Sequence, residues 1–274
     1  MNSDYFKTEL ITSKSNSTIV EIAKLNDKKY RDLTKRFICD GVKLFLECVE
    51  YGANIGYVIL NDNAEFDNFT LEKIRSIRDS GAKILCVTDS VFSKLTSEKA
   101  PQGIITVCDF LSEKHRYFTN AENIYDGEKV MLFESVRDPG NLGTIIRCAA
   151  AFGLDRIIIS SDCADIYSPK VMRSAMGAIF KVGIDIIDDF SSAIKILRAS
   201  GKRVLASMLG TRSLILGKDA VSESDVIVLG NEGHGISDKT AALCDDSVFI
   251  PMRANTESLN VSMAAGIFMW ELFG

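Results

Sequence analysis

From residue 129 onward the chain carries five short apolar runs, and this pattern constrains the fold more than any other feature. The runs are KVMLF (129–133), RIIIS (156–160), RVLAS (203–207), DVIVLG (225–230) and SVFIP (247–251). Segments with helical spacing lie between them. Strands that are apolar at nearly every position and alternate with helices are typical of a parallel sheet covered on both faces. The second half of the chain is therefore predicted to be an open α/β domain.

The first half of the chain shows a weaker alternation of the same kind. The predicted elements are strands at 36–39, 57–60, 83–87 and 103–107 and helices at 42–51 and 71–80, separated by glycines. The polar stretch 111–127 has no sustained periodicity and is predicted to be a linker. We therefore expect one α/β domain over 1–110 and a second over 128–274, in line with ~100–200 residues per domain.

Composition and charge exclude several classes of protein. The net charge of −5 argues against a surface that is basic throughout, so any contact with nucleic acid must be regional. The seven cysteines include no Cys-x-x-Cys pair and the chain has only two histidines, which speaks against a zinc site or a disulfide scaffold. No run reaches membrane-spanning or signal-peptide length. We expect a cytoplasmic protein with reduced thiols, no metal and no membrane contact.

The first candidate motif is ESVRDPGNLGTIIRCAAAFG at 134–153, where a predicted strand passes into a predicted helix. Asn141 suits the start of that helix. Arg147 follows small residues on the same helix face. Its long cationic side chain would lie over glycine and threonine residues and could extend from them to a ligand. The alternative is that Arg147 caps a neighbouring helix or pairs with a carboxylate.

The second candidate motif is VLGNEGHG at 228–235, a glycine-rich loop after a strand. It has neither the Gly-x-Gly-x-x-Gly order of a dinucleotide fold nor a Gly-Lys-Ser/Thr ending, and Glu232 would repel a phosphate. Asn231 and Glu232 beside exposed backbone favour a ligand with hydroxyls, an amine or a positive centre. The alternative is a tight turn in which Glu232 is merely solvated.

The third candidate motif is FIPMRANTESLNVSMAAGIFMWELFG at 249–274. Ser258 is a predicted N-cap, and Asn260 is placed in the first helical turn, where a polar side chain can face a ligand. The alternative is that both are capping residues only. The small residues at 264–266 allow close packing within the fold or across a dimer.

In order and spacing, these three motifs resemble those of the SpoU-type (TrmH-like) RNA 2′-O-ribose methyltransferases of the SPOUT superfamily, over essentially all of 129–274. The N-terminal part resembles the L30e-like substrate-binding domain often fused to such enzymes, through 11–31, RFICDGVKLFLE (36–47) and 100–107, with Asp40 where Glu is more usual. The resemblance implies a C-terminal SPOUT α/β trefoil-knot domain and a smaller N-terminal L30e-like α/β sandwich. It also implies a homodimer built on the helices at 258–273 and 138–152.

The resemblance further implies S-adenosylmethionine as the cofactor, bound without a metal. By position, the cofactor-binding residues would be Met208, Leu209, Gly210, Gly230, Asn231, Gly233, Ile250, Met252 and Leu259. The catalytic residues would be Asn141, Arg147, Glu232, Ser258 and Asn260. Since a guanidinium keeps its proton, Arg147 is interpreted as a cation that stabilises the developing alkoxide. The group that accepts the proton of the hydroxyl is not assigned.

A basic stretch, KLNDKKYRDLTKR at 24–36, is the predicted RNA-binding surface. It holds six basic and two acidic residues, and a helix capped by Thr18 and Glu21 would align its cations. The RNA-binding residues would be Lys24, Lys28, Arg31 and Lys35, with Arg173 and Ser174 in SPKVMRSAMGAIF (168–180) lining the substrate cleft. The alternative for the basic stretch is a solvated helix face.

Several functions remain open at this stage. Ribosomal RNA is favoured as the substrate by analogy, because the extra N-terminal domain is common in such enzymes; tRNA is the alternative. A catalytically inactive RNA-binding SPOUT protein is disfavoured because the catalytic positions are intact. A nucleotide-dependent oxidoreductase is disfavoured because the dinucleotide fingerprint is missing.

Overall fold

The computed structural model describes the chain except for residues 121–124, 126, 211–212, 232 and 254–257. The chain forms two compact units. The N-terminal unit comprises Met1–Leu111 together with Tyr167–Phe180, and the C-terminal unit comprises Ser112–Ile166 together with Lys181–Gly274. None of the described helices combines the length and the apolar character needed to cross a membrane.

The N-terminal unit is built on a five-stranded mixed sheet. Its strands, in the order in which they pair, are β1 (Leu10–Ile11), β4 (Lys83–Val87), β3 (Ile55–Asn61), β5 (Ile104–Asp109) and β2 (Arg36–Asp40). Only β5 runs antiparallel to its neighbours. The first four helices are α1 (Asn2–Phe6), α2 (Ser17–Lys24), α3 (Lys28–Thr34) and α4 (Val42–Glu50). They are followed by α5 (Asn68–Asp79), α6 (Asp89–Leu95), α8 (Pro169–Ala175) and a short 3-10 helix, Ala178–Phe180.

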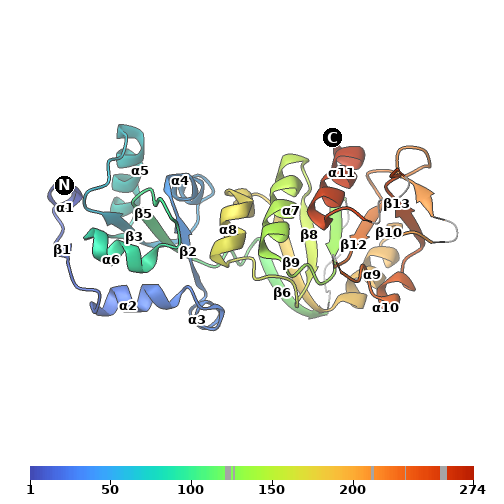
Figure 1. Cartoon of the computed structure of the whole chain (residues 1–274), viewed down its shortest axis with the longest axis horizontal. Helices are drawn as coiled ribbons and strands as arrows, with labels where there is room; N and C mark the ends of the chain where they lie inside the picture. The colour runs from blue at the N-terminus through green and yellow to red at the C-terminus, as the bar shows by residue number, and fades with distance from the viewer. Residues whose placement is uncertain (121–124, 126, 211–212, 232, 254–257) are drawn as a thin grey trace. The chain divides into compact units, whose positions relative to one another are not determined.

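Helices cover both faces of this sheet, with α4 and α5 on one side and α2 and α6 on the other (Figure 1). The core between α2, α6 and the sheet contains Ile19, Ile59 and Phe92, which are almost completely buried. The α/β character predicted for the first half is therefore confirmed.

The single helix predicted for the basic stretch is wrong, because this stretch is divided between two helices. The Asn16 side chain accepts the N–H groups of Thr18 and Ile19 and starts α2, so the expected Thr18 cap is also wrong. The Asp27 side chain starts α3 in the same way. A second N-cap inside the stretch stops one helix and begins another, so its cations do not share one helix face.

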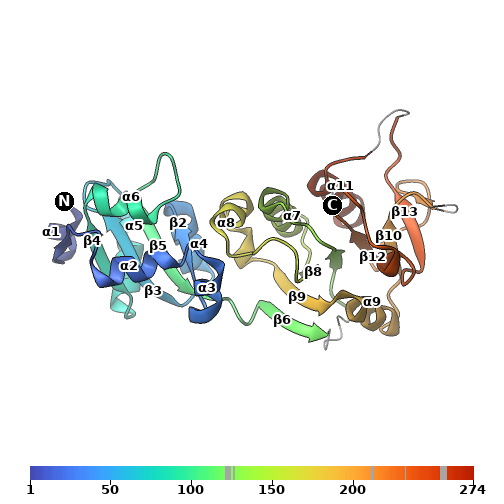
Figure 2. The same ribbon diagram turned by 60° about the horizontal axis from the view of Figure 1, so that its bottom comes forward.

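The C-terminal unit contains an eight-stranded sheet in which every pair is parallel. In pairing order the strands are β11 (Leu214–Ile215), β13 (Asp246–Phe249), β10 (Val204–Ser207), β12 (Val226–Leu229), β7 (Val130–Phe133), β8 (Arg156–Ser160), β9 (Gly183–Asp189) and β6 (His115–Asn120). The helices are α7 (Pro139–Ala151), α9 (Phe190–Ala199), α10 (Asp238–Ala241) and α11 (Val261–Phe273). Figure 2 shows α7 and α11 on one face and α9 on the other, and this arrangement confirms the predicted parallel sheet.

The strand order determines where the loops of this unit meet. Because parallel neighbours point the same way, the segments that leave β7, β10, β12 and β13 emerge at one edge of the sheet. Although β13 comes last in the chain, it is inserted between β10 and β11. The three sequence motifs therefore converge on this edge.

The stretch 111–127 is not a plain linker, because β6 lies within it and pairs with β9. Arg116 donates through Nε and Nη2 to the two carboxylate oxygens of Asp185, both at 2.9 Å, and Tyr125 Oη donates to Asp185 at 2.8 Å. Asp185 is completely buried and also contacts Arg156. A buried carboxylate requires such partners, and they tie this polar stretch to the C-terminal unit.

A second departure from the predicted domains concerns residues 167–180, which were expected in the second domain. This segment packs in the N-terminal unit, where the Tyr167 ring lies 4.5 Å from that of Phe37 and 4.2 Å from that of Phe110. Tyr167 Oη also accepts the backbone N–H of Leu111 at 2.9 Å. The N-terminal unit therefore draws on two separate parts of the chain.

Candidate active site

A cavity of about 340 Å³ lies at the sheet edge where the motifs converge. It is lined by Ser207, Met208, Leu209, Leu229, Gly230, Asn231, Gly233, Gly235, Phe249, Ile250, Met252, Ser258, Leu259, Val261 and Ala264. Every residue predicted to bind the cofactor is in this lining except Gly210, whose N–H donates to Ser213 Oγ at 2.5 Å. The structure thus brings together four separate segments at one cavity. That these residues bind a cofactor stays a prediction.

The loop after β12 is closed by its own backbone. Asn231 and Gly235 exchange two backbone hydrogen bonds, of 3.0 and 2.8 Å, and Gly235 has a φ of +68°. A Cβ on Gly230 would lie 2.1 Å from the carbonyl carbon of Gly235 and 2.2 Å from Ile236 N. Only glycine fits at position 230, because both contacts are with backbone atoms that cannot rotate away.

Asn231 also ties this loop to the segment after β7. Its Nδ2 donates to the carbonyl of Ser135 at 2.9 Å, and its Oδ1 accepts the N–H of Gly233 at 2.8 Å. Ser135 has a φ of +56°, an uncommon conformation for a residue with a side chain, and its Oγ donates to Asp162 at 2.7 Å. Burial raises the pKa of Asp162, but hydrogen bonds from Ser160 and others outweigh it and lower the pKa overall. The ionised Asp162 therefore helps to hold the strained turn.

Sequence reasoning missed Glu134, which fixes the far side of the same loop. Its carboxylate accepts the N–H and Oγ–H of Ser237 and the Oγ1–H of Thr240, each at 2.8 Å. Ser237 is also the N-cap of α10. A carboxylate directly after a buried strand was the available signal, but its partner lies about one hundred residues away in the chain.

The structure pairs two of the predicted catalytic residues. Asn260 Nδ2 donates to Asn141 Oδ1 at 3.0 Å, although the two residues are separated by 119 positions. Asn260 is itself the N-cap of α11 and accepts the N–H of Ser262, so the prediction that Ser258 is the cap is wrong. Ser258 instead lines the cavity. One asparagine thus starts α11 and joins it to the first turn of α7.

The helices α7 and α11 pack against each other within the chain. A Cβ on Gly266 would lie 3.6 Å from Cys148 Sγ, Ala265 is completely buried, and the rings of Phe152 and Trp270 are 6.0 Å apart. Gly266 therefore allows a close approach to α7, whereas Ala264 lines the cavity. The outer side of α11 is left with exposed apolar side chains.

Arg147 lies on α7, whose first turn is capped by the Asp138 side chain at 2.9 Å from Asn141 N. The Arg147 side chain is exposed and makes no ion pair with any residue that the structure describes, so the alternative of a structural ion pair has no support there. It is not part of the cavity lining. The remaining predicted catalytic residue, Glu232, lies outside the described residues.

The predicted RNA-binding residues fall into different environments. Lys24, Lys28 and Lys35 are exposed. Arg31 is 3% exposed and donates to the carbonyl of Leu25 at 2.6 Å, so its assignment to an exposed RNA-binding face is wrong. A buried guanidinium that satisfies a backbone carbonyl stabilises the α2–α3 connection.

The other two predicted RNA-binding residues lie on α8. Arg173 pairs with Glu98 at 2.5 Å and donates to Ser97 Oγ at 3.0 Å. Ser174 Oγ donates to the carbonyl of Lys170 at 2.7 Å. Both residues belong to the N-terminal unit, and their contact with RNA stays a prediction.

Three cysteines that are far apart in the sequence form a cluster in the N-terminal unit. The Sγ atoms of Cys39, Cys48 and Cys108 lie within 4.8 Å of one another and are completely buried. Burial raises the pKa of Cys39 and Cys48, which favours the thiol form. Sequence spacing could not reveal this group, and the expectation that the protein holds no metal stays a prediction.

Both halves of the chain match known protein families. Residues 128–270 match the SpoU rRNA Methylase family, and residues 16–106 match the MRM3-like substrate binding domain. The chain is 30% identical over 264 residues to the 23S rRNA (guanosine(2553)-2′-O)-methyltransferase of Bacillus subtilis, covering 96% of this chain and 99% of that protein. It is 26% identical to the 23S rRNA (uridine(2479)-2′-O)-methyltransferase of Streptomyces viridochromogenes, covering 91% and 86% of the two chains.

A solved structure supports the same grouping. The AdoMet-bound rRNA methyltransferase from Sinorhizobium meliloti has a TM-score of 0.82 against this chain at 29% identity. The similarity covers 96% of each chain, so it extends through both units.

Proposed function

The chain belongs to the SpoU rRNA Methylase family, and from this premise we propose that it methylates a ribose 2′-hydroxyl of ribosomal RNA in the cytoplasm. It is an S-adenosylmethionine-dependent RNA methyltransferase of the SPOUT fold class, as its three motifs predicted. The observation that carries the proposal is the meeting of those motifs at one sheet edge. The second and third motifs line one cavity, and the first joins the third through the Asn141–Asn260 hydrogen bond.

The cavity fits a cofactor of this kind. Gly230 is part of its lining and has no side chain, so a ligand at this position would meet backbone groups directly. Met208, Leu209 and Met252 supply apolar side chains that suit an adenine ring, and Asn231 supplies polar atoms. The lining that the structure describes holds no cation, which suits a cofactor with a positive sulfonium.

The bound cofactor supplies a methyl group on an already activated sulfonium, so the chain must mainly position the ribose and stabilise its developing alkoxide. We assign the stabilisation to Arg147, whose exposed guanidinium can grip two oxygens at once. Asn141 and Asn260 hold the first turns of α7 and α11 in register. They are positioning residues for the ribose and for Arg147.

The substrate is tested by mapping 2′-O-methylation across total RNA from cells with and without the gene. Loss of one methyl group in ribosomal RNA is the expected result. Loss of a methyl group only in tRNA would identify tRNA as the substrate in place of ribosomal RNA. An unchanged methylation map would favour the alternative of an inactive RNA-binding protein.

We propose that Lys24, Lys28 and Lys35 contribute RNA affinity through phosphate contacts. Replacing all three with alanine should weaken RNA binding and flatten its salt dependence by roughly 0.7–0.9 units of log–log slope for each lysine that binds a phosphate. Filter binding or fluorescence anisotropy across a salt series measures this slope.

Two single variants serve as controls for the basic surface. Lys195→Ala removes an exposed lysine from α9 and should leave the slope unchanged. Arg31→Ala should lower thermal stability, because a buried guanidinium is removed from the Leu25 carbonyl. A triple variant that retains the full salt slope would show that these lysines are only solvated.

We also propose a homodimer that uses the outer side of α11. Met263, Ile267 and Trp270 recur at helical spacing and are 61%, 37% and 63% exposed. An exposed apolar stripe of this kind marks an interaction surface. Light scattering should give a dimer mass for the unaltered protein at micromolar concentration, and Trp270→Glu should give a monomer.

The matched control for the dimer is Phe69→Glu, which places the same charge on an exposed aromatic residue of α5. It should leave the mass unchanged. A monomeric mass for the unaltered protein would rule out the dimer under these conditions.

A further inference from the structure

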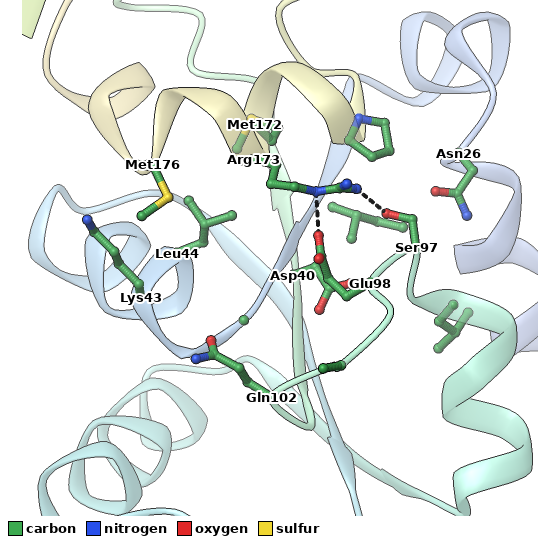
Figure 3. A pocket seen from close by; sticks show the side chains of 15 residues that line it. Asn26, Asp40, Lys43, Leu44, Ser97, Glu98, Gln102, Met172, Arg173 and Met176 are labelled. Atoms are coloured by element: carbon green, nitrogen blue, oxygen red, sulfur yellow. Dashed lines mark hydrogen bonds and ion pairs between the residues drawn. The ribbon is translucent and has the colours of Figure 1, made fainter. Parts of the chain in front are cut away.

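The N-terminal unit contains a second cavity, of about 360 Å³, that the methyl-transfer reaction does not use. It lies between the start of α4, the segment after α6 and helix α8, all within that unit (Figure 3). Its size falls in the range of roughly 300–1,000 Å³ that is usual for ligand pockets.

An unsatisfied acceptor lies in this pocket. Asp40 Oδ2 accepts the hydroxyl hydrogen of Thr96 at 2.5 Å, whereas Asp40 Oδ1 is buried and has no hydrogen-bond partner among the residues that the structure describes. Burial is the largest effect on this group and raises the pKa of Asp40. The Thr96 hydroxyl, the nearby Ser97 backbone and the charge of Arg173 lower it, and the charge of Glu98 raises it, so that the pKa is raised overall. Leaving a buried carboxylate oxygen unpaired is costly, so a ligand N–H donor would stabilise it.

Donors lie in the same lining. Gln102 Oε1 accepts the N–H of Val42 at 2.9 Å, which leaves its Nε2 as a donor. Lys43 supplies an exposed ammonium group. A ligand with N–H donors beside a carbonyl oxygen would match both sets of protein groups.

The charges of the lining balance, and its walls are apolar. The lining contains two carboxylates, Asp40 and Glu98, and two cations, Lys43 and Arg173, and Arg173 is paired with Glu98. A balanced lining favours a neutral ligand over a polyamine or a phosphate. Leu44, Met172 and Met176 add apolar side chains to the lining, as Figure 3 shows. Flexible thioethers pack favourably against aromatic rings.

We propose that this pocket binds one unpaired guanine base of the RNA substrate, read by the carboxylate of Asp40 beside the apolar side chains of Met172 and Met176. The Watson–Crick edge of guanine places two neighbouring N–H donors beside a carbonyl oxygen, and unpaired bases in RNA are read through such edges and by stacking. The assignment rests on the proposed function, because it takes RNA as the ligand.

The test uses the full-length protein and labelled uridine oligonucleotides that carry a single guanine, inosine or adenine. The unaltered protein should bind the guanine oligonucleotide about tenfold more tightly than the adenine one, with inosine between them because it lacks the 2-amino group. Asp40→Asn should abolish this preference, since an amide N–H would face the N–H donors of the base. Asp40→Glu keeps the carboxylate and should keep the order.

Two further variants keep the test decisive if Asp40→Asn is unstable. Asp79→Asn changes an exposed carboxylate on α5 and should bind like the unaltered protein. Met176→Ala removes one wall of the pocket and should weaken binding of all three oligonucleotides equally without changing their order. Equal affinity of the unaltered protein for the three, or a preference that survives in Asp40→Asn, would overturn the proposal.

The two proposals fail in different ways. Methylation of ribosomal RNA without a base preference at this pocket would reject only the guanine site. A preference abolished by Asp40→Asn in a protein that leaves ribosomal RNA unmethylated would reject the proposed function and keep the pocket as an RNA-binding site.

Discussion

Replacing Arg147 with alanine is expected to lower single-turnover methyl transfer about 10²–10³-fold while leaving S-adenosylmethionine affinity nearly unchanged. The reason is that Arg147 lies outside the cofactor cavity and makes no ion pair with a described residue, so its main interaction is expected in the transition state. Arg147→Lys retains the charge but loses the planar fork. It should therefore also be strongly impaired if two oxygens are held at once.

The measurements are calorimetry with the cofactor and single-turnover transfer to the RNA identified by methylation mapping. Lys195→Ala is the control for removal of an exposed cation. Near-normal transfer by Arg147→Ala would remove this residue from the chemistry. A selective loss of cofactor binding would make it part of the cofactor site instead.

The second large effect is expected at Gly230. Gly230→Ala should weaken S-adenosylmethionine binding by at least about tenfold, because its Cβ would overlap the backbone of Gly235 and Ile236. Overpacking costs roughly 1–3 kcal/mol, and each 1.4 kcal/mol is a factor of about ten in affinity. The loop would have to open to accommodate the side-chain methyl group of the alanine, and this opening would displace the residues that line the cavity.

Gly233→Ala is the matched control, since it adds the same methyl group to the same loop. The nearest atom to its Cβ is Asn231 Oδ1 at 3.3 Å, a side-chain atom that can shift slightly. Its affinity for the cofactor should fall much less than that of Gly230→Ala. Equal losses in the two variants, measured by calorimetry, would show that loop closure at Gly230 is not what shapes the site.

Local apolar patterns predicted nine of the thirteen described strands and missed β1, β6, β9 and β11. The run RIIIS coincides with β8 and KILCV with β4, and both are apolar at nearly every position. The position of β13 between β10 and β11 was not predictable from local patterns. General topological rules treat threaded chains as almost absent, so only the family resemblance suggested a knot.

The candidate site was predictable only where side chains act within their own motif. The motif resemblance placed the cavity-lining residues, but the Asn141–Asn260 bond and the bonds from Glu134 to α10 link distant parts of the chain. Arg31 shows a different limitation of sequence patterns, which is that they do not distinguish a buried cation from an exposed one. Charge patterning treats every cation in a basic stretch as exposed, whereas one of them turned inward to a carbonyl.

The return of residues 167–180 to the N-terminal unit has an evolutionary consequence. The backbone passes between the two units at 111/112, 166/167 and 180/181, so neither unit is a single continuous stretch of the sequence. A recombination event that exchanged only the first 111 residues would separate Phe37 and Phe110 from the Tyr167 ring that covers them. Such a chimera should be unstable unless the new N-terminal part came with its own version of 167–180. In chains with this organisation, the substrate-binding domain is therefore expected to be inherited together with the segment that corresponds to 167–180, and not to be acquired by exchange of the N-terminal residues alone.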